Sequence, residues 1–185
     1  MFVLYAIPIG IGIGYLIGGR LDRLGGLRLH WVPLILIGLA VQVAIFTEAG
    51  GEAAGQAGPA IYIGSAAIVL AAVLRNVTVP GVAIIALGAG CNLAAIVANG
   101  GRMPADPAAL DSIGGLGAGY TNSVIVTEPA LRPLTDVFAL PAWLPLANVF
   151  SVGDVLIGIG IATTIALAMG RQTSGDVGAS ERPRG

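Results

Sequence analysis

The sequence has no lysine, a single cysteine, a single histidine and few charged residues of either sign. Charged residues make up 10% of the 185 residues, and the formal net charge is −1. A nucleic-acid-binding surface needs a clustered excess of basic residues, so this composition gives no reason to expect a nucleic-acid partner. The lone cysteine, Cys91, excludes an intramolecular disulfide and a metal site built from several cysteines.

The usual sequence signatures of enzymes are also missing. We find no metal-ligand spacing of His, Cys and carboxylates, no glycine-rich phosphate loop followed by Lys-Ser/Thr, and no serine or cysteine with a histidine base expected on the same face. We therefore expect no catalytic residues, no metal and no cofactor. Met1 is followed directly by apolar residues without a basic segment or cleavage site, so the first apolar run is expected to remain as an anchor.

Apolar residues are what the sequence has in excess. They make up 56% of the chain, and the mean hydropathy is +0.89. Because a helix of roughly 17 to 25 apolar residues spans a bilayer, the long apolar runs predict transmembrane helices. The predicted fold is an all-α, polytopic membrane helix bundle over residues 1–170, with five transmembrane helices at about 2–19, 31–46, 59–74, 80–98 and 151–170.

The segments outside these runs are predicted to differ in character. Residues 99–136 are expected to form an outer loop, and the polar residues 171–185 a disordered cytoplasmic tail. The apolar stretch 137–150 is too short to cross a bilayer, and Pro141 and Pro145 argue against one long helix. With Trp143 suited to the headgroup region, we expect a Pro-broken interfacial or re-entrant segment.

The arginines predict the orientation in the membrane. Seven of the nine fall on one side of a five-helix chain: Arg20, Arg23, Arg28, Arg75, Arg171, Arg182 and Arg184. The other side carries two arginines and most of the acids: Arg102, Arg132, Glu48, Glu52, Asp106, Asp111, Glu128 and Asp136. Short arginine-rich loops stay cytoplasmic, so the N-terminus is predicted outside and the C-terminus in the cytoplasm.

Glycines recur every four residues in the first run, at Gly10, Gly14 and Gly18. Such a ridge of small residues lets another helix approach closely. Tight packing within the chain is the simplest interpretation. The alternative is a seam to a second copy or to a larger membrane complex, so the expected partners are the lipid bilayer and such an assembly.

Polar residues at two predicted loop–helix junctions form the candidate ligand site. One junction ends the fourth run and the other starts the fifth, and the predicted topology puts both on the outer face. The candidates are Asn92, Asn99, Gly100, Gly101, Arg102, Asp136, Asn148, Ser151 and Asp154.

Asp154 has two interpretations. Ser151 precedes it by three residues, which is the spacing of a capping box at a helix N-terminus. Alternatively, a carboxylate at membrane depth is costly and is often kept for a partner or ligand, such as a cation, a proton, Arg102 or Arg132.

The same motifs carry a family resemblance. Leu27 to Trp31, the Asn-Gly-Gly-x-Met-Pro motif at 99–104, Thr135-Asp136 and the Phe-Ser-Val-Gly-Asp motif at 150–154 resemble a family of small bacterial integral membrane proteins known only as a domain of unknown function. The resemblance implies a multi-pass protein of the bacterial plasma membrane and supplies no substrate.

Three functions therefore remain open from the sequence. The first is small-molecule or ion binding or transport through the outer-facing polar site. The second is a structural or accessory subunit of a membrane complex, and the third is a membrane-embedded enzyme acting on a lipid. We expect binding or transport ahead of catalysis.

Overall fold

The computed structural model describes residues 2–114 and 123–170, and the tail predicted to be disordered lies outside this range. The prediction of a mostly helical chain is confirmed. Five long helices match the five apolar runs to within a few residues: α1 (Ala6–Leu16), α2 (Val32–Ile45), α4 (Gly58–Leu74), α5 (Val82–Ala98) and α7 (Val152–Gly170). Short 3₁₀ helices precede and follow α1, namely η1 (Phe2–Tyr5) and η2 (Leu21–Gly26).

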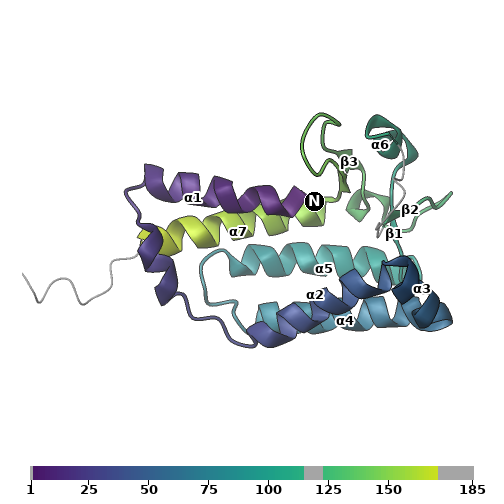
Figure 1. Ribbon diagram of the computed structural model, residues 1–185, viewed down its shortest axis with the longest axis horizontal. Coiled ribbons are helices and arrows are strands. Elements are labelled where there is room, and N and C mark those ends of the chain that lie inside the picture. The colour runs from purple at the N-terminus through teal and green to yellow at the C-terminus, as the bar shows by residue number, and fades with distance from the viewer. Residues whose placement is uncertain (1, 115–122, 171–185) are drawn as a thin grey trace, which may run out of the picture.

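The long helices contact one another in the order α1, α7, α5, α4 and α2, and α2 overlaps α4 in the view of Figure 1. Successive helices along the sequence run in opposite directions, so α1 and α7 are parallel neighbours, and the start of α1, the end of α5 and the start of α7 lie at one end of the bundle (Figure 1). We call this the junction end. The turn between α4 and α5, η2 and the end of α7 lie at the opposite end, which we call the η2 end (Figure 1).

The junction end contains more structure than the predicted loop and interfacial segment. Between α2 and α4 lie α3 (Glu48–Ala54) and η3 (Gly55–Ala57). The stretch 99–136 contains β1 (Met103–Pro104), α6 (Pro107–Ser112), β2 (Ser123–Val124) and η4 (Arg132–Leu134), with β1 parallel to β2.

The segment 137–150, predicted to be Pro-broken, is a β-hairpin. Strands β3 (Phe138–Ala139) and β4 (Val149–Phe150) pair antiparallel, and both prolines of the segment lie in the loop between them. Phe150 stacks between Phe2 and Phe138, at ring-centroid distances of 4.3 and 5.5 Å. Aromatic stacking across strands thus gives this stretch a β structure that its hydropathy did not indicate.

Helix length qualifies the prediction of five membrane spans. Two helical stretches, Glu48–Leu74 and Val152–Gly170, are long and apolar enough to cross a membrane. The other apolar helices, Phe2–Leu16, Val32–Ile45 and Val82–Ala98, have 10–17 residues each. At 1.5 Å per residue, 17 residues reach about 26 Å, which is less than the hydrocarbon core of roughly 30 Å. Length and composition therefore support two spanning helices, and not the predicted five.

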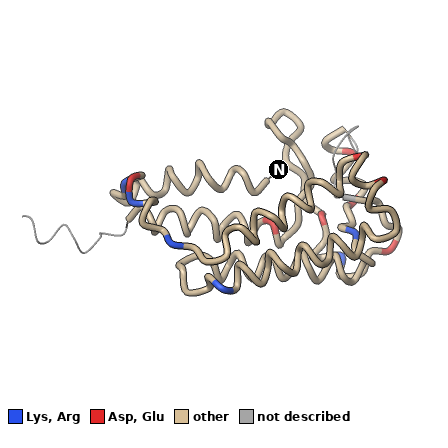
Figure 2. The backbone as a smooth tube through the Cα atoms, turned by 60° about the horizontal axis from the view of Figure 1, so that its bottom comes forward, with Lys and Arg blue, Asp and Glu red and all other residues tan. Residues whose placement is uncertain are grey.

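Charged residues gather at the two ends of the bundle, and the lengths of the helices between them are nearly free of charge (Figure 2). Large apolar side chains are exposed instead on α1, α2, α4, α5 and α7, among them Ile9, Ile37, Ile68, Leu87 and Ile159. Exposed apolar surface on every long helix is more than a water-soluble monomer normally presents.

Candidate functional site

Helices α5 and α7 approach each other closely where the candidate residues meet. A Cβ atom built on Gly153 would lie 2.7 Å from the carbonyl oxygen of Gly88, and one on Gly88 would lie 2.4 Å from that of Gly153. Only glycine fits this crossing without moving a backbone. The close approach brings Asn92, in the middle of α5, within hydrogen-bonding reach of the first turn of α7.

Asn92, Ser151 and Asp154 form a closed ring of hydrogen bonds, which we call the polar lock. Asn92 Nδ2 donates to Asp154 Oδ1 at 2.9 Å, and Ser151 Oγ donates to Asn92 Oδ1 at 2.7 Å. The amide of Asp154 donates to Ser151 Oγ at 3.0 Å, and the amide of Ser151 donates to Asp154 Oδ2 at 3.1 Å. The last two bonds are those of a capping box.

The polar lock supplies the hydrogen-bond partners of the Asp154 side chain. Its hydrogen-bond partners are Asn92 and Ser151, and the pairing with Arg102 or Arg132 is not found among the described residues. Arg132 pairs instead with Asp106 at 3.0 Å, and Arg102 is exposed. Ser151 is fully buried and Asp154 is half-buried.

The motif that ends α5 forms a helix C-cap. The amide of Gly101 donates to Ile96 O at 2.8 Å and that of Gly100 to Val97 O at 3.2 Å, which is the Schellman pattern. Both glycines have positive φ, 65° and 80°. A Cβ on Gly101 would lie 2.5 Å from Cβ of Pro59, so this glycine also seats the start of α4.

Asn99 ties the same helix end to the chain before η4. Its Nδ2 donates to Ala95 O at 2.8 Å and Ala130 O at 2.9 Å, and its Oδ1 accepts from the amide of Ala130 at 2.9 Å. The candidate asparagines of α5 therefore make separate sets of contacts.

Asp136 and Asn148 lie in the segments that cover the junction end. The amide of Asp136 donates to Pro104 O and its carbonyl accepts from the amide of Asp106, both at 2.9 Å, and the residue is buried. Asn148 Nδ2 donates to Val149 O at 2.8 Å, next to the hairpin pairing. Both residues share the junction end with the polar lock, but these hydrogen bonds join them to Pro104, Asp106 and Val149 and not to the polar lock.

The carboxyl of Asp106 is held by two kinds of donor. The hydrogen bond from Arg132 is the main reason that the pKa of Asp106 is lowered from its usual value, and the amides of Ala108 and Ala109 lower it further. Asp106 thereby caps α6 and fixes Arg132 in one place.

Sequence reasoning missed a second polar junction at the η2 end. Asn76, in the turn after α4, is buried, and its side chain bonds to both the amide and the carbonyl of His30 and to Ala72 O. The signal was an asparagine directly after a helix C-terminus, where its amide can bond to free backbone groups. Nearby, Thr164 Oγ1 lies 2.9 Å from Pro80 O, joining α7 to the start of α5.

The candidate residues do not line the cavities found in the fold. Neither the apolar groove between α1 and α7 nor the small cavity beside Thr164 is lined by Asn92, Ser151 or Asp154. The described residues contain no group of three or more His, Cys, Asp or Glu side chains that could hold a metal ion. The arrangement can cap α7, join it to α5 and bury a polar pair without leaving a donor unmatched.

The family model of a family of unknown function, DUF5317, matches residues 26–166. No curated protein and no solved structure matches the chain. The matched range contains the polar lock, the C-cap of α5 and the hairpin, and the chain belongs to this family.

Proposed function

We propose that this DUF5317 protein is a multi-pass membrane protein with a structural role, acting as an accessory subunit of a membrane assembly. The observation that carries this proposal is the closure of the polar lock. Its side chains hydrogen-bond to one another, and within the described chain every buried side-chain nitrogen or oxygen has a hydrogen-bond partner. A site prepared for a ligand would present polar atoms to it, whereas these atoms hold two helices together.

The membrane part of the proposal rests on exposed apolar surface. Apolar side chains cover the outside of all five long helices, while charge is concentrated at the two ends. We propose that all five helices cross the bilayer. Flanking turns such as η1 lengthen the short ones, and local thinning of the bilayer accommodates the remainder at modest cost.

The orientation follows from the same ends. The described arginines of the η2 end are Arg20, Arg23, Arg28 and Arg75, and the acids Glu48, Glu52 and Asp111 lie in segments at the junction end. We propose that the η2 end faces the cytoplasm, with the N-terminus outside.

Ion or small-molecule binding at Asp154 is the second candidate. One observation favours it: Asp154 is half-buried, and the polar lock gives each of its carboxylate oxygens one hydrogen bond, which leaves room for a further ligand. Lipid chemistry has no comparable support, because the groove that opens sideways is lined by none of the candidate residues.

Thermal unfolding in detergent separates the two candidates. The full chain and Asp154→Asn are compared across a panel of ions, amino acids and nucleotides, because a ligand of the native state raises its apparent stability. The structural proposal predicts that the variant is less stable in every condition and that no compound stabilises only the parent. A compound that stabilises the parent and not the variant would replace it with the binding function.

A further inference from the structure

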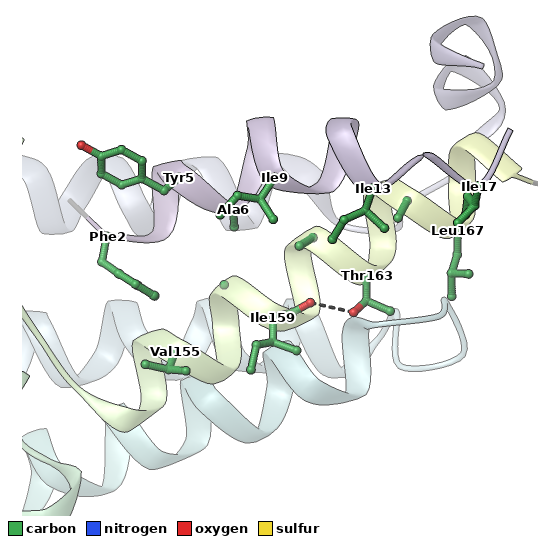
Figure 3. Close-up of a pocket in the computed structure, with 13 residues that line it drawn as sticks. Phe2, Tyr5, Ala6, Ile9, Ile13, Ile17, Val155, Ile159, Thr163 and Leu167 are labelled. Carbon is green, nitrogen blue, oxygen red and sulfur yellow. Dashed lines mark hydrogen bonds between the residues drawn. The ribbon is translucent and has the colours of Figure 1, made fainter. Parts of the chain in front are cut away.

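A long apolar groove runs between α1 and α7 (Figure 3). Its volume is about 490 Å³, within the range of roughly 300 to 1,000 Å³ typical of small-molecule sites. It extends from Phe2 and Val155 near the junction end to Ile17 and Leu167 near the η2 end (Figure 3).

The groove has a floor of small residues between two rows of branched ones. Ala162 and Ala166, one helical turn apart on α7, are buried and form the floor together with Gly158. Ile9 and Ile13 on α1 and Ile159 on α7 rise beside it and are exposed. Side chains four residues apart lie above one another on a helix, so these rows continue along the helix axes.

The lining offers nothing to a polar ligand. No charged residue lines the groove, and its two hydroxyl groups already donate to backbone carbonyls, Tyr5 to Pro145 O and Thr163 to Ile159 O. The occupant is therefore hydrocarbon along its length. One extended acyl chain lying parallel to the helices would fit the narrow space between the isoleucines of α1 and Ile159 of α7.

Positive charge stands at one end of this groove. Ile17 and Leu167 are followed by Arg20 and Met169, and the amide of Arg20 and Nη1 of Arg23 both donate to Met169 O, at 3.0 and 3.3 Å. The carbonyl at the C-terminus of α7 holds the guanidinium of Arg23 there, in agreement with the helix dipole.

Among the described residues of segment 20–28, positive charge exceeds negative charge. Segment 20–28 contains three arginines and one acid, Asp22, which pairs with Arg20 at 3.0 Å. A guanidinium has five N–H donors, so the bond to Met169 O leaves Arg23 donors for a phosphate. Basic residues at the cytoplasmic ends of transmembrane helices are typical sites for anionic headgroups.

We propose that the groove holds one acyl chain of an anionic phospholipid of the cytoplasmic leaflet, with its phosphate at Arg23. This inference rests on the membrane location and orientation proposed above. Lipid tails are as apolar as the groove, so an acyl chain gains little free energy by moving from the surrounding lipid into the groove. The preference for one lipid over another therefore comes from its headgroup. The lipid would complete the face of α1 and α7 that no other described element covers.

Native mass spectrometry of the detergent-purified full chain tests the proposal. Phosphatidylglycerol and phosphatidylcholine with the same acyl chains are titrated separately. We expect one phosphatidylglycerol per chain, bound more tightly than phosphatidylcholine by about fivefold for each arginine beside the headgroup, because phosphatidylglycerol has a net negative charge whereas the choline group neutralises the phosphate of phosphatidylcholine. Equal binding of the two lipids, or no binding of either, would overturn the proposal.

Two matched pairs of variants locate the site. Ile159→Trp fills the groove with another apolar side chain and should abolish the binding, whereas Ile37→Trp, on the exposed face of α2, should keep it. Arg23→Gln should reduce the preference for phosphatidylglycerol about fivefold, and Arg75→Gln, on the turn between α4 and α5, should not. If Arg23→Gln unfolds, Ile13→Trp replaces it as a second test of the groove.

The results also identify other occupants and separate the two proposals. A dimer that Ile159→Trp dissociates would show that a second copy fills the groove and would refute the lipid site. Membrane residence is measured independently, by whether alkaline carbonate releases the protein from membranes. Release would refute the membrane location, whereas retention without lipid selectivity would refute only the lipid site.

Discussion

At the scale of single residues, polar side chains join elements that are distant in the sequence. Asn92 and Asp154 are 62 positions apart and bond directly, and Asn76 and His30 are 46 apart. Inside a bilayer or an apolar core, a polar group without a partner is costly, so each such residue specifies which helices must be neighbours. The hydrogen bonds of the candidate site therefore account for the pairing of α5 with α7.

Ser151→Ala should lower the free energy of unfolding by about 1 to 2 kcal/mol, because it removes the helix cap and the donor to Asn92 Oδ1. Denaturant-induced unfolding in detergent measures the change. Thr163→Val is the control in the same helix, because that hydroxyl bonds only to the carbonyl of Ile159 and its loss should cost less than about 0.5 kcal/mol. Equal losses in both variants would contradict a special role for the polar lock.

The Asp106–Arg132 pair predicts a pH dependence at the junction end. The folded-state pKa of Asp106 is lowered from 3.8, so the pair stabilises the fold above that pH, and the stabilisation is lost as the pH falls through the folded-state value. Hydrogen exchange of the α6 amides should accelerate relative to that of α5 over this acidic range.

Asp106→Asn retains a capping side chain but removes the titrating carboxylate. In this variant the exchange of α6 should no longer change relative to α5 over the same range, because the pH-dependent charge pair is gone. An unchanged pH profile in Asp106→Asn would show that another group is responsible.

At the scale of elements, glycine positions determine which helix faces meet. Gly10 and Gly14 both face α7: added Cβ atoms would lie 2.9 Å from Ala162 Cα and 2.4 Å from Met169 Sδ. Gly18, the third member of the predicted ridge, has open space and a positive φ of 77°. Two of the three regularly spaced glycines therefore allow close packing on α7, and the third allows the chain to turn after α1. The fold of this chain accounts for all three.

Gly88→Ala should destabilise the protein by about 1 to 3 kcal/mol, because its Cβ would lie 2.4 Å from a backbone oxygen of α7 and the helices would have to separate. Gly90→Ala, two residues away in the same helix, meets nothing within 4 Å and should stabilise by about 0.5 to 1 kcal/mol. Unfolding curves of the two variants should shift in opposite directions. Two shifts of the same sign would contradict the packing described for α5 and α7.

At the scale of the whole molecule, the alternation of the helices brings three sequence segments to the junction end. The start of α1, the end of α5 and the hairpin lie there (Figure 1), and Phe150 stacks between Phe2 and Phe138, which joins the start of the chain to the hairpin. Trp143 at the hairpin tip is 80% exposed, which suits a side chain at the headgroup boundary.

Reporter fusions test the orientation of the whole chain. A reporter active only in the cytoplasm should be active when it is fused after Gly170 and inactive when it is inserted between Asp111 and Ser112 in the segment after α5. The reason is that the arginine-rich η2 end remains in the cytoplasm. Activity at both positions would mean that the chain does not cross the bilayer between them and would contradict the proposed orientation.

The sequence determined the helical class, the places of the five long helices and the spacing of the capping box. These depend on local properties: runs of apolar residues, and Ser151 three positions before Asp154. Hydropathy located the apolar helices but did not determine their lengths, because it counts apolar residues and not the length of continuous helix, which for α2 ends at Ile45.

The tertiary structure alone decided which helices are neighbours, that Asn92 completes the cap of α7, and that the stretch 137–150 is a hairpin. Each of these depends on contacts between residues dozens of positions apart, such as Gly88 with Gly153 or Phe2 with Phe150. A local sequence pattern does not identify the distant partner of a residue, because a small residue or an aromatic ring can pack against many different partners. The groove between α1 and α7 likewise exists only once those helices are placed together.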